Sequence, residues 1–217
     1  VPETATIDSL DWQKLSAIPM TNYYKNKKDA NFKAAYRMAW NRKGFFIEVA
    51  VKDRMFSHVE FKKTENRWDN DCLQVYFDSL GDAATRTVKG YDKNDYDYAI
   101  FPNKAGTKSI VWRYYTADQQ LGLGIYAPKN NTVASDIPSR FIRRADGYVY
   151  RVFFPEKYLL PGTMRKGHVM GVGILAGNAN DDNVKYLKRR ISGLSNTIDG
   201  QGGYLKPYIW PLILLWD

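Results

Sequence analysis

The feature that most limits the possible fold is a series of nine short runs separated by turn residues. In these runs apolar and polar residues alternate, or β-branched and aromatic residues predominate. Successive side chains of a strand point to opposite faces, so such runs predict strands rather than helices. No long amphipathic helix and no internal repeat is evident. We therefore predict an all-β fold, an antiparallel β-sandwich of two packed sheets, immunoglobulin-like or jelly-roll-like. The predicted strands are 34–40, 45–52, 72–78, 96–101, 109–115, 140–144, 148–154, 169–176 and 210–216.

Two turns predict hairpins, because each places a glycine directly before a strand. They are Asn41-Arg42-Lys43-Gly44 and Arg144-Ala145-Asp146-Gly147. Residues 155–160 read as a single helical turn that starts at a proline and ends at Pro161-Gly162. The 217 residues suit one β domain, so we predict a single domain over residues 1–217.

The strand 72–78 divides its side chains between two faces. One face holds Leu73, Val75 and Phe77, and the other holds Cys72, Gln74 and Tyr76. We predict that the first face builds the core and that the second meets a ligand, with Trp68 in the polar loop before the strand. An aromatic ring beside polar groups on a rigid sheet is what sugar recognition needs, although the same arrangement is also compatible with ordinary sandwich packing. Cys72, the single cysteine, is predicted to be a buried, inert thiol.

Composition excludes several kinds of chemistry. The only histidines are His58 and His168, neither near a nucleophile motif, and one cysteine cannot build a thiolate cluster. There is no phosphate-binding glycine motif and no nucleic-acid recognition motif, so we predict no catalytic residue and no nucleic-acid partner. The net charge of +9 favours polyanions, although the lysines and arginines are scattered.

Two acidic stretches are candidates for a structural calcium ion, because carboxylate and amide oxygens are the ligands that calcium prefers. They are the Asp92, Asp95 and Asp97 group and Asn180-Asp181-Asp182. Neither matches an EF-hand loop, and ordinary turn caps are the alternative. The metal ligands are therefore left unknown.

No stretch is long and apolar enough to span a membrane, and Val1 does not begin a signal peptide. The chain is then either cytosolic or the product of leader removal. We expect a secreted, periplasmic or cell-surface protein.

The loop and strand around residue 70 form the motif Trp68-x-x-Asp71-x-x-Gln74-Val75-x-Phe77-Asp78. This motif is the most specific of several that resemble the family 9 carbohydrate-binding modules and their wider relatives with the DOMON-like fold. The resemblance extends nearly from end to end. Further matching segments are Thr6-Ile7-Asp8 with Asp11-Trp12, residues 46–53, Gly147-Tyr148-Val149-Tyr150-Arg151, Asn178-Ala179-Asn180-Asp181, and Trp210-Pro211-Leu212-Ile213-Leu214.

The resemblance implies a β-sandwich that binds glycans without cleaving them, often as part of a secreted enzyme. Two aromatic rings clamp a terminal sugar in such modules, and polar side chains hold its hydroxyls. Trp68 falls at the position of the first clamping ring. Tyr204, in the loop before the last strand, is the candidate for the second ring. We predict Gln74, Arg113 and Asn178 as polar contacts. No cofactor is predicted as certain, and a structural calcium ion is the one candidate.

Two departures from the family pattern remove negative charge. Gln74 and Arg151 each stand where the family commonly has glutamate, which favours an anionic glycan as the partner. Arg151 has an alternative role as the ion-pair partner of Glu48.

Two other functions remain open. Relatives of this fold hold a b-type haem through methionine with histidine or lysine, and Met55, Met170 and His168 are the candidates here, with core packing as the alternative for a methionine. The other function is a structural or interaction domain that has lost sugar binding.

Overall fold

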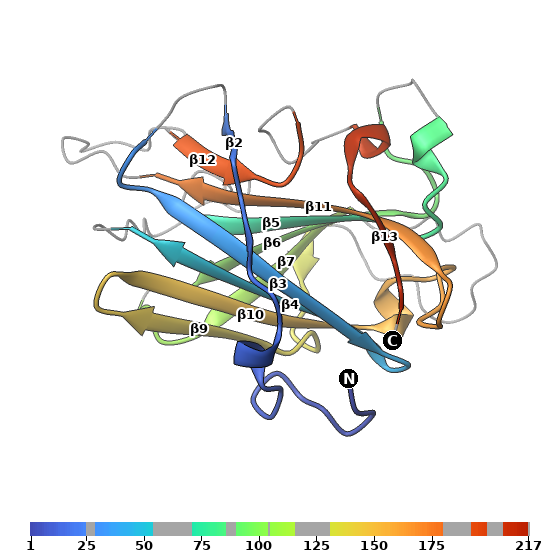
Figure 1. Ribbon diagram of the computed structural model, residues 1–217, viewed down its shortest axis with the longest axis horizontal. Helices are drawn as coiled ribbons and strands as arrows, with labels where there is room; N and C mark the ends of the chain where they lie inside the picture. Colours follow the sequence, from blue (N-terminus) through green and yellow to red (C-terminus); the bar gives the residue numbers. More distant parts are fainter. Residues whose placement is uncertain are drawn as a thin grey trace.

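The computed structural model describes residues 1–24, 29–53, 71–85, 90–103, 105–115, 131–179, 192–198 and 206–216. Within these residues the strands form two antiparallel sheets, a five-stranded sheet in the order β1-β3-β4-β10-β9 and an eight-stranded sheet in the order β2-β12-β11-β5-β6-β7-β8, with β13 also paired to β11. The five-stranded sheet lies in front of the other in Figure 1. The predicted antiparallel β-sandwich is confirmed.

All nine predicted strands are present. Four shorter strands were not predicted, since two to four residues are too few for a visible alternation. The last strand is shorter than predicted, because Trp210 ends a 3₁₀ turn and Pro211 has no N–H to donate. The strands are β1 (Ile18–Pro19), β2 (Asn22–Tyr23), β3 (Lys33–Asn41), β4 (Gly44–Lys52), β5 (Cys72–Asp78), β6 (Asp95–Pro102), β7 (Ser109–Tyr115), β8 (Thr132–Val133), β9 (Ser139–Arg144), β10 (Gly147–Pro155), β11 (Val169–Asn178), β12 (Ser192–Ser195) and β13 (Leu212–Leu214).

Both predicted hairpins are confirmed. Asn41 pairs with Gly44 and Arg144 pairs with Gly147, so each turn has two residues outside the ladder. A Cβ on Gly44 would lie 2.2 Å from the Phe154 carbonyl oxygen, and a Cβ on Gly147 would lie 2.0 Å from that of Val51. Close approach of a neighbouring strand therefore requires glycine at both positions. The predicted helical turn is the 3₁₀ turn Glu156–Tyr158.

The main core lies between the two sheets and is rich in aromatic rings. Leu73, Val75 and Phe77 of β5 face it, as predicted, and all three are at most 1% exposed. The Phe77 ring meets the Phe154 ring edge-on, with centroids 4.8 Å apart, and Tyr98 lies 5.0 Å from Phe154. Edge-to-face and tilted pairs of this kind join the two sheets across the core.

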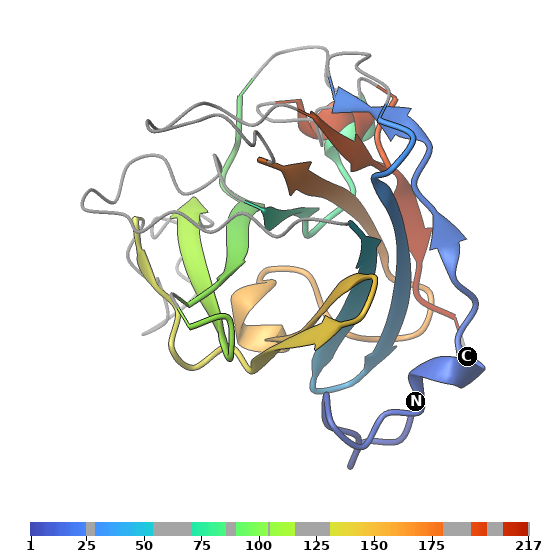
Figure 2. The ribbon, with the colours of Figure 1, turned by 90° about the vertical axis from the view of Figure 1, so that its left-hand side faces the viewer.

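The N-terminal segment covers the outer face of the five-stranded sheet, as Figure 2 shows. Ile7 and Trp12 pack on Phe46 in a second buried cluster. The Trp12 indole donates a hydrogen bond to the Ile7 carbonyl at 3.1 Å. This cover explains why Phe46, on the face away from the main core, has no exposed surface.

Alkaline pH is expected to destabilise the fold through buried tyrosines. Burial raises the pKa of the Tyr148 and Tyr150 hydroxyls well above 10. The unfolded chain ionises tyrosine near pH 10 while the folded chain keeps these two protonated, so stability is complete below pH 10 and falls as the pH rises above it. We expect the two residues to lower the free energy of unfolding by about 2–3 kcal/mol between pH 9 and pH 11.

Urea unfolding at several pH values measures this loss. Tyr150→Phe should reduce the slope of stability against pH above pH 10, whatever its effect at neutral pH. A free energy of unfolding that stays flat between pH 9 and pH 11 would show that these hydroxyls ionise in the folded protein as they do in the unfolded one.

Candidate functional site

The candidate site is centred where β5 begins and β11 ends, which we call the Asp71 end of the sandwich. Asp71 is fully buried. Its Oδ1 accepts a hydrogen bond from the Ala179 backbone N–H at 2.8 Å, and its carbonyl accepts one from the Tyr150 hydroxyl at 2.9 Å. One residue therefore ties together β5, the end of β11 and the opposite sheet.

Asp71 and Tyr150 were not predicted as site residues, although a signal existed. Asp71 is the acidic position of the Trp-x-x-Asp motif, three residues after Trp68. Its contacts show that the motif's carboxylate is a structural anchor at the point where the 54–70 segment rejoins the sheet. Tyr150 belongs to an alternating strand, and only the packing of the two sheets brings its hydroxyl to Asp71.

Gln74 lies on the outer face of β5, away from the main core. Its cross-strand neighbours are Leu175 of β11 and Ala99 of β6. The side chain is only 5% exposed. Gln74 therefore lies on the face of β5 that was predicted to meet a ligand, near the Asp71 end. Neighbouring residues leave little of it exposed.

The prediction that this whole face is open to a ligand is wrong for Cys72 and Tyr76. The Tyr76 ring stacks on Trp210, with centroids 5.6 Å apart and planes 24° apart. Cys72 is buried in a cluster with Phe101 and Trp112, which agrees with the predicted inert thiol. Apolar partners brought from other strands cover both side chains, and no periodicity within β5 could reveal them.

Asn178 is the last residue of β11 and joins the two sheets at the Asp71 end. Its Nδ2 donates a hydrogen bond to Asp29 Oδ2 at 3.2 Å, and Asp29 leads into β3 of the five-stranded sheet. The side chain is 3% exposed. Alternation along β11 puts Asn178 on the side of Ala176, which faces the core. Gln74 and Asn178 thus share one end of the fold while their side chains belong to different faces.

Arg113 is not brought together with Gln74, which corrects the predicted grouping. It is paired with Tyr98, a residue of the main core, and only 4% of it is exposed. Its guanidinium lies 5.0 Å from the centre of the Tyr158 ring. Burial raises the pKa of the Tyr98 hydroxyl, while the charge of Arg113 and its hydrogen bond lower it. Arg113 therefore acts between the sheets, on the face opposite Gln74.

The two predicted stacking residues, Trp68 and Tyr204, lie outside the described residues. The same is true of Met55 and of the acidic stretch 180–182. Their predicted roles remain predictions.

The alternative role of Arg151 is confirmed. Its Nε lies 2.8 Å from Glu48 Oε2, and the two residues are direct cross-strand partners. Arg37 Nη1 bonds the other Glu48 oxygen, also at 2.8 Å. The Trp12 ring lies 5.3 Å from the Arg151 guanidinium carbon. Arg151 therefore neutralises a buried carboxylate under the N-terminal segment and not at the Asp71 end.

The first candidate calcium stretch makes internal hydrogen bonds. Asp95 Oδ2 accepts from the Asp92 backbone N–H at 2.7 Å, and Asp97 Oδ2 accepts from the Tyr91 hydroxyl at 3.0 Å. Among the described residues, no group of three or more histidine, cysteine, aspartate or glutamate side chains is arranged to hold a metal ion. The bond from the Asp92 backbone N–H to Asp95 is that of a turn cap.

The haem alternative gains no support from Met170 and His168. Met170 is fully buried in the main core. His168 Nε2 lies 2.8 Å from the Ser79 carbonyl oxygen and is engaged there. Both side chains have structural roles. The described part of the chain also contains no helix with the length and hydropathy of a membrane span.

Solved structures share this fold at low sequence identity. A family 9 carbohydrate-binding module from Caldicellulosiruptor kristjanssonii in complex with glucose has a TM-score of 0.68 and 13% identity, covering 99% of this chain and 91% of that one. The module from this organism in complex with cellotriose has a TM-score of 0.67 and 14% identity, covering 95% and 85%. A putative carbohydrate-binding protein from Bacteroides uniformis has a TM-score of 0.57 and 12% identity, covering 95% and 89%.

No curated protein matches the chain by sequence. The family model described as carbohydrate family 9 binding domain-like does match it, over residues 5–213. That range includes the Trp-x-x-Asp motif and every strand of the described residues except the last residue of β13. The chain therefore belongs to the carbohydrate family 9 binding domain-like family.

Proposed function

We propose that this chain is a single, non-catalytic carbohydrate-binding module that acts with a secreted, periplasmic or cell-surface system for glycan degradation. The observation that carries the proposal is the anchoring of Asp71 within a chain of this family. Three residues span at most about 11 Å, so a fixed Asp71 limits how far Trp68 can lie from the Asp71 end. Trp68 would supply the stacking ring there.

The polar contacts proposed at this site are Gln74 and Asn178, with Tyr204 as the second ring. Arg113 is left out, because its guanidinium lies between the sheets against the Tyr158 ring, whereas Asn178 ends β11 at the Asp71 end. Relatives in this family bind glucose and cellotriose, which makes neutral β-glucans the first ligands to test. We expect weak binding of a short sugar, with a Kd on the order of micromolar to millimolar, because few groups contribute.

Trp68→Ala is the direct test. Loss of a stacking ring at the centre of a small site is expected to weaken binding of cellotriose at least about tenfold. Leu214→Ala is the control, since Leu214 is 55% exposed and pairs with Val169, at the end of β11 opposite the Asp71 end. Titration calorimetry with cellotriose and retention on insoluble polysaccharides, each at two salt concentrations, measure both effects.

Binding that resists salt and disappears only in Trp68→Ala would support the proposed site. Equal retention of all three proteins, confined to acidic glycans and abolished by salt, would contradict it. The family fold would then serve as an interaction domain.

A further inference from the structure

A second candidate site lies at the end of the sandwich opposite Asp71. β11 runs from Val169 at this end to Asn178 at the Asp71 end. A cavity of about 460 Å³ is found here, within the size range of small-ligand pockets. The lining side chains used below are Glu3, Trp40, Arg42, Arg165, Lys166 and Trp216.

The cavity carries an excess of positive charge. Arg42, Arg165 and Lys166 are all exposed side chains. Within the part of the chain that the structure describes, neither the Arg42 nor the Arg165 guanidinium forms an ion pair or a hydrogen bond. Arginine is well suited to planar two-point recognition of a carboxylate or sulfate group. Two cations of this kind at one cavity therefore favour an anionic ligand.

Aromatic surface stands beside these charges. The Trp40 indole donates a hydrogen bond to the Trp216 carbonyl at 2.9 Å, which joins β3 to the segment after β13. Trp216 is 62% exposed, and Lys166 Nζ lies 4.3 Å from the centre of its ring. A large exposed indole beside unpaired arginines offers an apolar surface for the C–H face of a pyranose ring.

Glu3 adds a carboxylate to the lining of the cavity. Glu3 Oε1 accepts from the Arg42 backbone N–H at 3.1 Å, which holds this carboxylate at the β3–β4 turn. A carboxylate repels a phosphate-rich ligand and accepts bonds from hydroxyl groups. The combination of arginine donors, an indole surface and a carboxylate acceptor matches a hydroxylated ring that carries one acidic group.

We propose that this cavity is a second carbohydrate site, specific for an acidic saccharide such as a uronic-acid oligomer. Arg42 and Arg165 would bind the carboxylate, Trp216 would stack on the ring, and Glu3 would accept from a hydroxyl. The choice of a saccharide as the ligand rests on the proposed function. The position of the cavity does not rest on it, because Gln74 and Asn178 belong to the opposite end.

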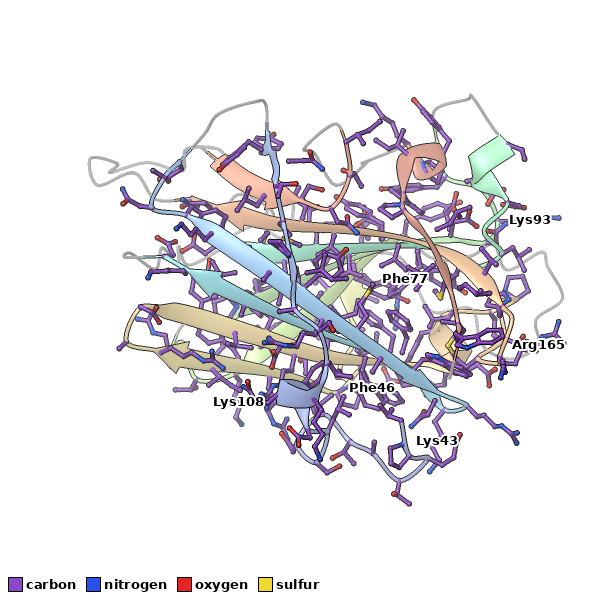
Figure 3. The ribbon with its side chains drawn as sticks, in the orientation of Figure 1. Lys43, Phe46, Phe77, Lys93, Lys108 and Arg165 are labelled. Atoms are coloured by element: carbon purple, nitrogen blue, oxygen red, sulfur yellow. The ribbon has the colours of Figure 1, made fainter. Side chains whose placement is uncertain are left out.

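The test uses the full chain and a charge-matched control. The pocket variant is Arg42→Ala/Arg165→Ala, and the control Lys93→Ala/Lys108→Ala removes the same charge outside the cavity. Figure 3 shows Arg165 and Lys108 at opposite ends of the molecule. Titration calorimetry with a galacturonic-acid trimer, with cellotriose and with a mononucleotide is performed on both variants and on Trp216→Ala.

We expect the pocket variant and Trp216→Ala to bind the galacturonic-acid trimer at least about tenfold more weakly, and the control to change little. Cellotriose binding should stay the same in all three variants, so loss of the Asp71-end site is distinguishable from loss of this one. An equal loss in the control would mean general charge attraction and would overturn the proposal. Tighter binding of the mononucleotide than of the trimer, or no binding of the trimer to the wild-type chain, would overturn it as well.

Discussion

Phe77→Ala is expected to lower the free energy of unfolding by about 3–5 kcal/mol, among the largest effects of any single substitution in this fold. Phe77 has no exposed surface and lies in the core between the sheets. Its ring meets Phe45, Tyr98 and Phe154, with centroids between 4.8 and 6.3 Å away. Alanine would remove these contacts and leave a cavity that rigid strands on both sides cannot fill.

Urea unfolding of the variant measures this loss. Phe153→Ala is the matched control, because Phe153 is the adjacent residue to Phe154 on the other face of β10 and is only partly buried. Its ring contacts Phe46 in the smaller cluster, so a smaller loss is expected. A cost for Phe77→Ala no greater than that for Phe153→Ala would show that the two sheets can close over the missing ring.

Glu48→Gln is expected to destabilise the fold by about 3 kcal/mol, since it leaves two cations without their buried counter-ion. The Glu48 side chain is 2% exposed, whereas Arg37 and Arg151 are 18% and 19% exposed. Both arginines bond its carboxylate at 2.8 Å. The two guanidinium groups keep partial access to water, which recovers some of the lost interaction, so the value lies at the lower end of the cost of breaking a buried pair.

Arg140→Ala provides the comparison for Glu48→Gln. The Arg140–Asp8 pair has a similar distance, 2.7 Å, but its side chains are 53% and 58% exposed. Solvent screening limits such a pair to about 1 kcal/mol. Equal effects of the two substitutions in urea unfolding would indicate that water reaches the Glu48 group. Raising the salt concentration should reduce the Arg140 effect more than the Glu48 effect.

Local patterns were sufficient to predict most of the fold. The alternation in Leu73, Val75 and Phe77 predicted their common face, and the structure places all three in the core. Gly44 and Gly147 predicted hairpin turns, and both hairpins form. These features depend on neighbours within one strand or across one turn, which is why periodicity and turn chemistry reveal them.

The candidate site was predicted less completely. Residues 110–115 include apolar or aromatic side chains on both faces of β7, so alternation could not show that Arg113 faces the core and Trp112 faces outward. Asp71 was recognised only as part of a motif. Its role depends on Ala179 and on Tyr150, which lie 108 and 79 residues away in the chain.

The sequence by itself determined an antiparallel β-sandwich, because strand period and turn residues act over short distances. The family was indicated separately, by motifs that resemble it, and is shown by the family model. Only the tertiary structure decided which strand faces are covered, that Arg151 neutralises Glu48, and that Trp40, Arg165 and Trp216 line one cavity. These contacts join residues distant along the chain. They follow from how the two sheets stack and where the terminal segments lie, and no local pattern encodes that packing.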